Sequence, residues 1–224
     1  MKRLSQPIGK LKDRYQVVII GSGYGGAIAA SRLSRAGQEV CVLERGREFI
    51  NGSYPNTSKS IKKNIQTSSA EGRKGSKTAL YEFKLCEEIN VFVGCGLGGT
   101  SLINKNEAVM PSRQFFEDVA WPEEFRNDYK DLMELDVRHA TEMLTPAEYP
   151  DHFPRLSKLD TLKKIASPLN GTFSKSPIAV NFKEGINRVG IYQPACKLCG
   201  DCVTGCNHDA KNTLVMNYLP DAVK

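Results

Sequence analysis

The sequence lacks the long apolar runs from which membrane spans are built. No stretch of its 224 residues approaches the roughly 20 consecutive apolar residues that a transmembrane helix needs. The basic start, MKRLSQPIGKLKDR, is not followed by the apolar segment of a secretory signal. We therefore interpret residues 1–14 as a flexible basic tail, expect no transmembrane segment, and take the cytoplasm as the default compartment.

Aromatic residues are also scarce, at 8% of a chain whose net charge is +6. Much of the positive charge lies in the tail and in residues 59–77, where lysine and arginine are mixed with serine, threonine and glycine. No aromatic side chains are interleaved with these charges, although binding of single-stranded nucleic acid favours such a pattern. We therefore predict a solvated loop over residues 53–77 and no nucleic-acid partner. The shares of apolar residues (40%) and charged residues (25%) are typical of a soluble globular protein.

Disulfide bonds are a poor explanation for the seven cysteines of the chain. The number is odd, and four of the cysteines fall within the eleven residues 196–206. Because no secretory signal is expected either, this clustering favours thiol or metal chemistry in a reducing compartment over a disulfide framework.

The most informative stretch is YQVVIIGSGYGG, residues 15–26. Its β-branched run Val17–Ile20 predicts a short buried parallel strand, because the run is brief, apolar and stopped by glycine. The glycines that follow match the pattern G-x-G-x-x-G and are Gly21, Gly23 and Gly26. In this pattern the first glycine permits a tight turn, the second lets a pyrophosphate approach the backbone, and the third lets a helix pack closely on the strand. We predict that this helix spans residues 25–36 and offers its N-terminus to phosphate.

A second predicted strand, Val40–Leu43, ends at Glu44. An acidic residue at this place can accept hydrogen bonds from the ribose hydroxyls of an adenosine and would repel a 2′-phosphate. Strand, glycine turn, helix, strand and acid thus occur in order within the thirty residues 15–44, which favours dinucleotide binding. The alternative is an ordinary βαβ turn whose glycines serve only packing. The motif alone does not choose FAD over NAD.

A second glycine-rich stretch, GCGLGGTSLIN, covers residues 94–104. Its glycines remove side chains from a path where backbone lies close to something flat or bulky. Thr100 and Ser101 are candidate N-cap residues and donors to a phosphate or ring, and Asn104 carries an amide suited to the edge of a heterocycle. The alternative is a flexible turn, and the apolar residues within the stretch argue against it because they would be buried.

The two glycine motifs, in YQVVIIGSGYGGAIAA with VCVLERG and in GCGLGGTSLIN, resemble those of the glucose–methanol–choline (GMC) oxidoreductase family, particularly its cholesterol-oxidase-like branch. The resemblance continues into CGDCVTGCNHDAKNTLVMNYLP, residues 199–220, and so covers most of the chain. It implies FAD as the cofactor and an α/β fold. That fold would be a doubly wound, Rossmann-like FAD-binding domain with a helical insertion and the start of a substrate-side β-sheet region. The resemblance also implies an incomplete fold, with the chain an N-terminal portion of such a protein.

The resemblance further implies which residues contact FAD. The first motif would hold the pyrophosphate, Glu44 the adenosine ribose, and the second motif would lie along the flavin, with Asn104 nearest the isoalloxazine ring. The expected cofactor-binding residues are Gly21, Gly23, Tyr24, Gly25, Gly26, Glu44, Gly99, Thr100, Ser101 and Asn104. Relatives usually have a small residue where this chain has Lys105. We expect that lysine to face solvent, and the alternative is a cation that stabilises a reduced flavin.

The rest of the chain is divided by changes of pattern. The predicted units are a basic tail (1–14), a dinucleotide-binding core (15–110), a helical segment (111–170) and the start of a substrate-side region with a cysteine-rich loop (171–224). Within them we expect strands at 80–85, 89–93 and 177–182. Apolar residues at helical spacing between Tyr129 and Leu144 predict a packed core stripe.

The clustered cysteines have the spacing C-x2-C-x2-C-x3-C of bacterial ferredoxins and are Cys196, Cys199, Cys202 and Cys206. This spacing is typical of iron–sulfur sites and makes a [4Fe-4S] cluster one candidate. Two features count against it, because Asn207 replaces the usual proline and the chain has no second run of this kind. Zinc is another candidate, because paired C-x2-C ligands suit it. The third interpretation is a structural loop of reduced thiols near the flavin.

Three classes of function stay open on the sequence. The first is an FAD-dependent oxidoreductase acting on the CH–OH group of an alcohol or sterol, with O2 as one candidate electron acceptor. In the resembled family a histidine, paired with another histidine or an asparagine, handles the alcohol proton. None of His139, His152 and His208 matches that position, so we expect no catalytic residue in this chain and little or no turnover by it alone. The second class is a flavin and iron–sulfur electron-transfer protein, and the third is a non-catalytic dinucleotide-binding fragment.

Overall fold

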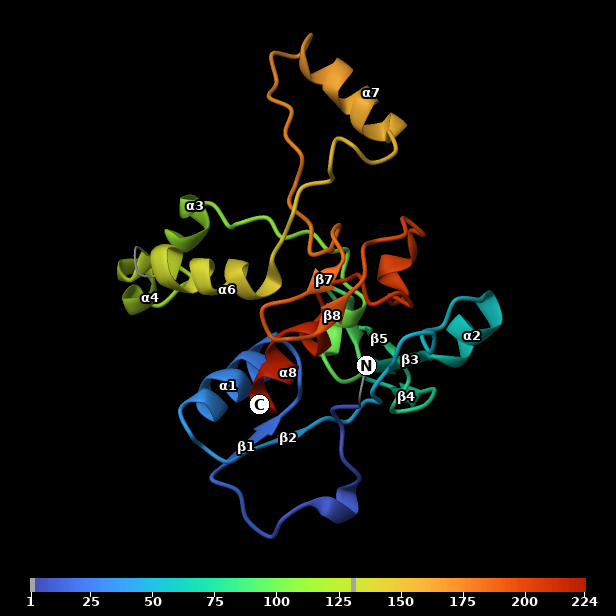
Figure 1. Cartoon of the computed structure of the whole chain (residues 1–224), viewed down its shortest axis with the longest axis vertical. Coiled ribbons are helices and arrows are strands. Elements are labelled where there is room, and N and C mark those ends of the chain that lie inside the picture. The colour runs from blue at the N-terminus through green and yellow to red at the C-terminus, as the bar shows by residue number, and fades with distance from the viewer. Residues whose placement is uncertain (1–2, 130–131) are drawn as a thin grey trace.

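The structure is a computed structural model and describes residues 3–129 and 132–224. Its strands are β1 (Val17–Ile20), β2 (Val40–Leu43), β3 (Ile65–Ser69), β4 (Gly72–Lys74), β5 (Tyr81–Lys84), β6 (Val91–Gly94), β7 (Gly185–Ile186) and β8 (Tyr192–Gln193). Its helices are α1 (Tyr24–Arg35), α2 (Ser58–Lys63), α3 (Arg113–Phe116), α4 (Glu123–Asn127), α6 (Val137–Leu144), α7 (Ser157–Ala166) and α8 (Tyr218–Ala222). Short 3-10 turns lie at Ile8–Lys10, Gly99–Leu102, Asp201–Val203 and Leu214–Met216, and a π-helical turn at Leu132–Asp136. In Figure 1 the strands, α1 and α8 belong to a central body, from which α3, α4 and α6 project on one side and α7 at the end of an arm.

The first βαβ unit forms as the sequence predicts. β1 and β2 pair in parallel, with Val17 opposite Val40 and Ile20 opposite Leu43. Both strands have the predicted bounds. The prediction that β1 is buried is wrong, because its alternate side chains face outward and leave Val18 and Ile20 53% and 88% exposed. The small side chains of Ala27 and Ala30 are fully buried, and they let α1 pack closely on its neighbours.

α8 packs on α1 through a buried carboxylate. Asp221 accepts hydrogen bonds from Ser31 Oγ at 2.5 Å and from Arg35 Nε at 2.7 Å. Burial alone would raise the pKa of Asp221, but the hydrogen bonds from Arg35 and Ser31 outweigh it and hold the pKa below its ordinary value. The ionised carboxylate therefore stabilises the contact between the two helices.

Replacing Asp221 by asparagine is expected to lower the free energy of unfolding by about 2 kcal/mol at neutral pH. Arg35 loses its ion pair, although its half-exposed side chain limits the loss, and Ser31 loses its charged acceptor. The difference should shrink as the pH falls through the ordinary aspartate pKa of 3.8 and below, since protonation removes the same charge from the wild-type protein. Urea unfolding followed by circular dichroism at neutral and acidic pH measures both effects.

The exposed ion pair between Arg155 and Asp160 provides the control. The variant Asp160→Asn should change the free energy of unfolding by less than about 0.5 kcal/mol at any pH. Equal losses in the Asp221→Asn and Asp160→Asn variants would contradict a special role for the buried carboxylate.

Residues 53–77 are not the solvated loop that their composition predicts. α2 begins with a capping box, in which Thr57 and Ser60 each bond the backbone N–H of the other. β3 and β4 form a hairpin, and β3 also pairs in parallel with β5, giving a mixed sheet in the order β4-β3-β5-β6. The prediction is wrong because a strand rich in serine and threonine is stabilised here by its neighbours and not by its own composition. The strands expected at 80–85 and 89–93 are confirmed as β5 and β6.

The hydrophobic core lies between α1, the mixed sheet and the segment that leads into α8. Its fully buried large side chains include Leu80, Leu102 and Leu214, which are far apart in the sequence. Leu102 and Ile103 belong to the second glycine motif. Their burial anchors that motif in the core and argues against a flexible turn, in agreement with the prediction that these apolar residues are buried.

The helical segment buries fewer apolar side chains than the sequence predicts. Trp121 stacks on Phe125 where α4 meets the chain before it, but no residue of α6 is fully buried. Of the predicted apolar stripe, the side chains of Leu132 and Met133 lie outside the described residues. The described part of the stripe is therefore a partly covered surface and not a core.

The prediction of a strand at residues 177–182 is wrong. This segment makes only single bridges, including those from Ile178 to Glu107 and from Val180 to Lys211. Its bridges reach different parts of the chain, so none of these partners runs beside it long enough to form a ladder. In the described part of this region, strands occur only as the short hairpin of β7 and β8.

The N-terminal segment is not a free tail. Leu4 N and Ser5 N donate to the Glu48 carboxylate at 2.8 and 3.1 Å, and Ser5 Oγ donates at 2.6 Å. Leu4 also packs against the core. From Arg3 onward the expectation of a flexible tail is therefore wrong, because a nearly buried carboxylate binds the segment.

The α/β class is confirmed, whereas the doubly wound sheet is not. Among the described residues the strands form three separate sheets, and β1 pairs with β2 alone. This arrangement is consistent with a Rossmann-like domain, and the boundaries at 110 and 170 stay predictions.

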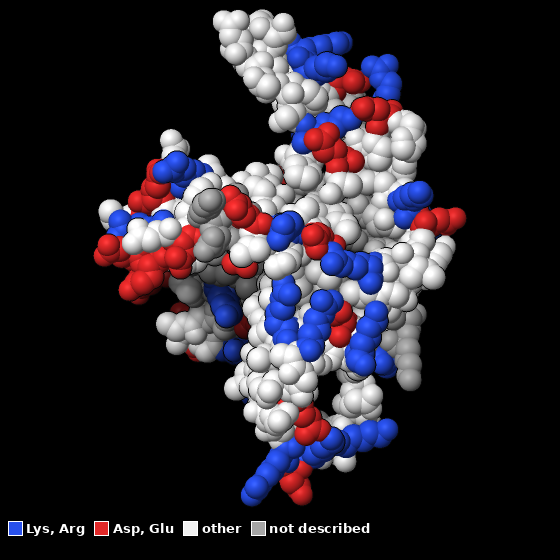
Figure 2. All heavy atoms as spheres, turned by 60° about the vertical axis from the view of Figure 1, so that its left-hand side comes forward, with Lys and Arg blue, Asp and Glu red and all other residues white. Residues whose placement is uncertain are grey.

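No helix in the described ranges is both long and apolar enough to cross a membrane. Figure 2 shows Lys and Arg side chains spread over the face in view, with Asp and Glu among them.

Candidate cofactor site

The site is organised around the N-terminus of α1. Gly21 has a φ of +90°, the left-handed conformation that the predicted tight turn needs. A Cβ on Gly26 would overlap the Gly21 carbonyl oxygen, so helix and strand are as close as predicted. Beside Gly23 and Gly25, in contrast, the Cβ positions have no atom within 4 Å, and no side chain caps the helix. α1 therefore presents free N–H donors and its positive end to an open cradle.

The second glycine motif packs directly on the first. A Cβ on Gly99, whose φ is +56°, would lie 2.8 Å from the Cα of Gly23. Asn104 Nδ2 donates a hydrogen bond to the hydroxyl of Tyr24 at 2.9 Å. The residues expected to hold the pyrophosphate and those expected to lie along the flavin therefore form one continuous surface.

Glu44 lies where β2 ends, as the sequence predicts. One carboxylate oxygen accepts from Ser22 N at 3.0 Å and Ser22 Oγ at 2.7 Å, and the other accepts from Gly46 N at 2.7 Å. Ser22 Oγ accepts in turn from Gly98 N at 2.9 Å. A carboxylate has about four acceptor positions, so one stays free for a hydroxyl group. Glu44 thus joins three turns and still offers an acceptor.

The other expected contacts differ in what they can offer. Thr100 Oγ1 accepts from Gly94 N at 3.2 Å and is half-buried. Ser101 is buried, and its Oγ accepts from Leu214 N at 3.1 Å while it donates within its own loop. Its hydroxyl is therefore used to hold the loop, which leaves its backbone as the part that can meet a cofactor. Lys105 is exposed, as expected.

A family model decides the class of this chain. The model described as FAD dependent oxidoreductase matches residues 16–177, a range that contains both glycine motifs. The chain belongs to the FAD-dependent oxidoreductase family.

Individual relatives of this FAD-dependent oxidoreductase are similar over nearly its whole length. A cholesterol oxidase of Mycobacterium tuberculosis is 31% identical over 93% of this chain and 37% of its own. A cholesterol oxidase of Acinetobacter baumannii is 29% identical over 94% of this chain and 38% of its own. An uncharacterised GMC-type oxidoreductase of Mycobacterium tuberculosis is 28% identical over 93% of this chain and 30% of its own. The similarity to GMC oxidoreductases is confirmed, and the chain spans about 37% of the length of the first of these relatives.

The residues of this FAD-dependent oxidoreductase fit the cofactor that its family implies. The open cradle at Gly23 and Gly25 can take a pyrophosphate, and Glu44 has an acceptor to spare. Asn106, two residues beyond Asn104, is 4% exposed. Its Oδ1 is one of two buried side-chain atoms that lack a hydrogen-bond partner among the described residues. Buried polar atoms are rarely unpaired in native proteins, so Asn106 is consistent with a bound group that donates to it.

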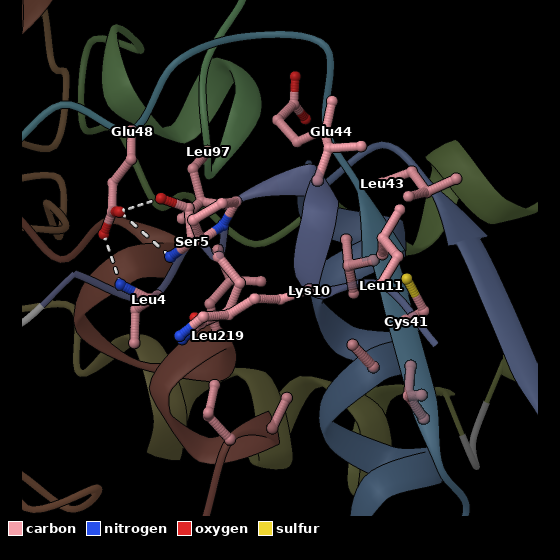
Figure 3. Close-up of a pocket in the computed structure, with 18 of the residues that line it drawn as sticks. Leu4, Ser5, Lys10, Leu11, Cys41, Leu43, Glu44, Glu48, Leu97 and Leu219 are labelled. Carbon is pink, nitrogen blue, oxygen red and sulfur yellow. Dashed lines mark hydrogen bonds between the residues drawn. The ribbon is translucent and has the colours of Figure 1, made fainter. Parts of the chain in front are cut away.

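A cavity of about 370 Å³ begins beside Glu44 and runs along β2 (Figure 3). It lies between the N-terminal segment and α8, with Leu11 and Leu219 among its apolar walls. Figure 3 shows Glu48 holding Leu4 at its rim. The prediction of a flexible tail over residues 1–14 leaves no place for this cavity, because part of that segment forms one of its walls. The apolar residues spaced along that segment were the available signal.

Among the described residues, the structure does not support a metal site in the cysteine loop. All four cysteines line a cavity of about 20 Å³, which has room for about one water molecule. Lys211 lines the same cavity. No group of three or more His, Cys, Asp or Glu in the described residues is placed to hold a metal ion. The [4Fe-4S] and zinc interpretations are therefore unsupported for Cys196, Cys199, Cys202 and Cys206. The remaining interpretation is a structural loop, whose cysteines are free thiols in the structure.

Lys211 is a buried residue outside the predicted set of cofactor-binding residues. Its side chain is almost inaccessible, with 2% of the residue exposed. Burial lowers its pKa to about 8. No sequence signal marks it, because lysine is ordinarily a surface residue and its burial depends on contacts made by the folded chain.

Proposed function

We propose that this chain forms the FAD-binding part of an oxidoreductase that acts on the CH–OH group of an alcohol, with sterols as the substrate class. The single observation that carries the proposal is the contact between the two glycine motifs at the uncapped start of α1, with Glu44 beside it. The sterol class is supported by the printed names of relatives that are cholesterol oxidases at 29–31% identity. FAD supplies the two-electron oxidation of an alcohol carbon to a carbonyl.

Each group of residues has a defined task in this proposal. The N–H groups at the start of α1, beside Gly23 and Gly25, bind the pyrophosphate, and Glu44 binds the adenosine ribose. The surface from Gly99 to Asn104 binds the flavin. Individual contacts within this set are proposals, as is the choice of O2 as electron acceptor.

The alcohol proton is assigned to none of the three histidines. Among the described residues, His139, His152 and His208 form no hydrogen bond with either glycine motif or with Asn104. We infer that the 224 residues supply cofactor binding and that turnover requires groups from outside them. A doubly wound sheet completed by further strands is part of the same proposal.

The test is a spectrum of the gently purified protein, followed by a titration of the apoprotein with FAD. We expect oxidised-flavin absorbance, no iron or acid-labile sulfide, and no bleaching of the flavin by cholesterol or simple alcohols under anaerobic conditions. A protein that leaves FAD unbound would contradict the proposed cofactor site. Rapid bleaching by an alcohol would contradict the assignment of the proton-transfer group to residues outside this chain, and iron with sulfide would revive the electron-transfer alternative.

A further inference from the structure

The four cysteines of the cysteine loop, residues 196–206, lie close to one another. All four are free thiols, and all four line the same cavity of about 20 Å³. Burial raises the pKa of Cys196, and the thiolates of the other three cysteines raise it further. Because a charge shifts the pKa of a thiol in this way only from nearby, the sulfur atoms share one small region of the structure.

Two of these cysteines lie in a part of the loop that hydrogen bonds hold in place. The carbonyl oxygen of Cys202 accepts a hydrogen bond from Lys211 Nζ at 2.9 Å. Next to Cys206, the side chain of Asn207 accepts from the N–H of Tyr54 at 2.9 Å and donates to the carbonyl oxygen of Tyr54 at 3.1 Å. Since Tyr54 belongs to the hydrophobic core, the loop from Cys202 onward is fixed to the body of the protein.

Cys199, in contrast, is exposed to solvent. None of the hydrogen bonds among the described residues involves it. Its neighbours Leu198 and Gly200 have φ values of +58° and +82°, so the chain turns sharply on both sides of Cys199. The next turn, Asp201–Val203, contains Cys202. The cysteine that solvent reaches is therefore the least constrained of the loop, and a fixed thiol follows it three residues later.

This pairing suits reversible thiol oxidation. Cysteines that respond to oxidants are accessible to solvent and lie next to a second cysteine, which attacks the oxidised sulfur as a thiolate. Burial lowers the pKa of Lys211 to about 8, and the thiolates of Cys202 and Cys206 act against that lowering. A thiolate formed at either sulfur therefore has a cation nearby.

We propose that Cys199 and Cys202 are a dithiol site that a hydroperoxide oxidises to a disulfide. The sulfur of Cys199 attacks one peroxide oxygen, the O–O bond breaks, and Cys199 becomes a sulfenic acid as water leaves. The Cys202 sulfur then attacks the Cys199 sulfur, the S–O bond breaks, and a second water leaves as the S–S bond forms. Two electrons pass from the thiols to the peroxide, and the two thiol protons leave in the two waters.

The site rests on the proposed function only for one source of its oxidant, since two-electron reduction of O2 yields hydrogen peroxide. The experiment therefore adds hydrogen peroxide to the reduced protein, with or without FAD. It compares the wild type with Cys202→Ser, which lacks the attacking thiol. The control is Cys86→Ser, which removes an exposed cysteine outside the loop. A protein that does not bind FAD would defeat the proposed function and leave this test unchanged.

Mass spectrometry of tryptic peptides, after the remaining thiols are blocked, identifies the bond that forms. Trypsin cleaves after Lys197, so a disulfide between Cys199 and Cys202 stays within the peptide of residues 198–211. A disulfide between Cys196 and Cys199 would instead join two peptides. Fragmentation of the peptide 198–211 distinguishes Cys202 from Cys206 as the partner.

We expect the Cys199–Cys202 disulfide in the wild type and in Cys86→Ser, and full recovery of both thiols with dithiothreitol. In Cys202→Ser, dimedone should trap a sulfenic acid at Cys199. Sulfinic acid at Cys199, which dithiothreitol does not reverse, should be about tenfold more abundant there than in the wild type. Equal amounts of sulfinic acid in the two proteins would overturn the proposal.

Three other results would also overturn it. They are wild-type thiols that resist peroxide, a disulfide between another pair of loop cysteines, and iron or zinc bound to the loop. If Cys202→Ser does not fold, Cys199→Ser takes its place, because Cys199 is exposed and forms no hydrogen bond in the described part of the chain. In that variant Cys202 should stay a free thiol after peroxide treatment, and a disulfide from Cys202 to Cys206 would contradict the proposed pair.

Discussion

Replacing Gly26 by alanine is expected to abolish FAD binding and to lower the free energy of unfolding by about 3 kcal/mol. The added Cβ would overlap the carbonyl oxygen of Gly21 and would lie 3.2 Å from Ile19 Cγ2. Both neighbours belong to β1 or its turn, so α1 has to move away from the strand. That movement displaces the helix N-terminus from the turn and from Gly99, and thereby opens the proposed pyrophosphate cradle. Urea unfolding of the apoprotein and titration with FAD measure the two effects.

Gly25→Ala is the matched control for this substitution. It adds the same methyl group one residue earlier, where no atom lies within 4 Å of the Cβ position. We expect the free energy of unfolding to stay equal or to rise slightly, since alanine favours the helix. FAD affinity should still fall, because the methyl group enters the open cradle. A Gly25→Ala variant that binds FAD like the wild type would show that the open side of α1 is not the cofactor surface.

The first βαβ unit could be predicted from the sequence because its signals are local. The run Val17–Ile20 and the stop at Gly21 define a strand without reference to the rest of the chain, and Glu44 marks the end of β2. The glycine spacing carries its own geometric meaning, since the close approach at Gly26 follows from the helix that starts beside it. Here the bounds of the strands agree with the structure, and the helix begins and ends one residue before the predicted bounds.

The failures of prediction all depend on contacts between distant segments. β3 is a strand because it pairs with β5, and nothing in the composition of Ile65–Ser69 announces that partner. The apolar run at 177–182 has the composition of a strand but lacks a continuous partner. The cysteine spacing fits a ferredoxin, yet the loop closes around a cavity of about 20 Å³ that Lys211 also lines. Spacing along the chain does not reveal which side chain fills the space inside a loop.

The candidate site was predicted in its parts and not in its assembly. Each glycine motif was identified from the sequence, but their direct contact at Gly23 and Gly99 depends on the packing of Leu102 and its neighbours in the core. At Ser101 the hydroxyl that suits cofactor binding is used to hold the loop, which the sequence does not reveal, and a contact through its backbone stays a prediction. The burial of Lys211 has no signal in the sequence, since it depends on the carbonyl groups that accept hydrogen bonds from its ammonium.

Replacing Glu44 by glutamine is expected to weaken FAD binding about 30-fold, which corresponds to about 2 kcal/mol. In the wild type three donors converge on the carboxylate, from Ser22 N, Ser22 Oγ and Gly46 N. The NH2 group of glutamine would replace one acceptor by a donor, so one N–H or hydroxyl of the turns would face another donor. The turns would separate, and the charged acceptor proposed for the adenosine ribose would be lost. FAD titration of the two apoproteins measures the change.

Glu48→Gln makes the same chemical change on a carboxylate that also holds backbone N–H groups. The Glu48 side chain is 3% exposed, and its partners are Leu4 and Ser5 of the N-terminal segment. This variant should release that segment, which limited proteolysis near the N-terminus would detect, while FAD affinity changes by less than about twofold. The two carboxylates lie along the same cavity, so the comparison separates the ribose acceptor from the cavity wall. Equal losses of FAD affinity in both variants would contradict a specific role for Glu44 and would place the adenosine against the N-terminal segment.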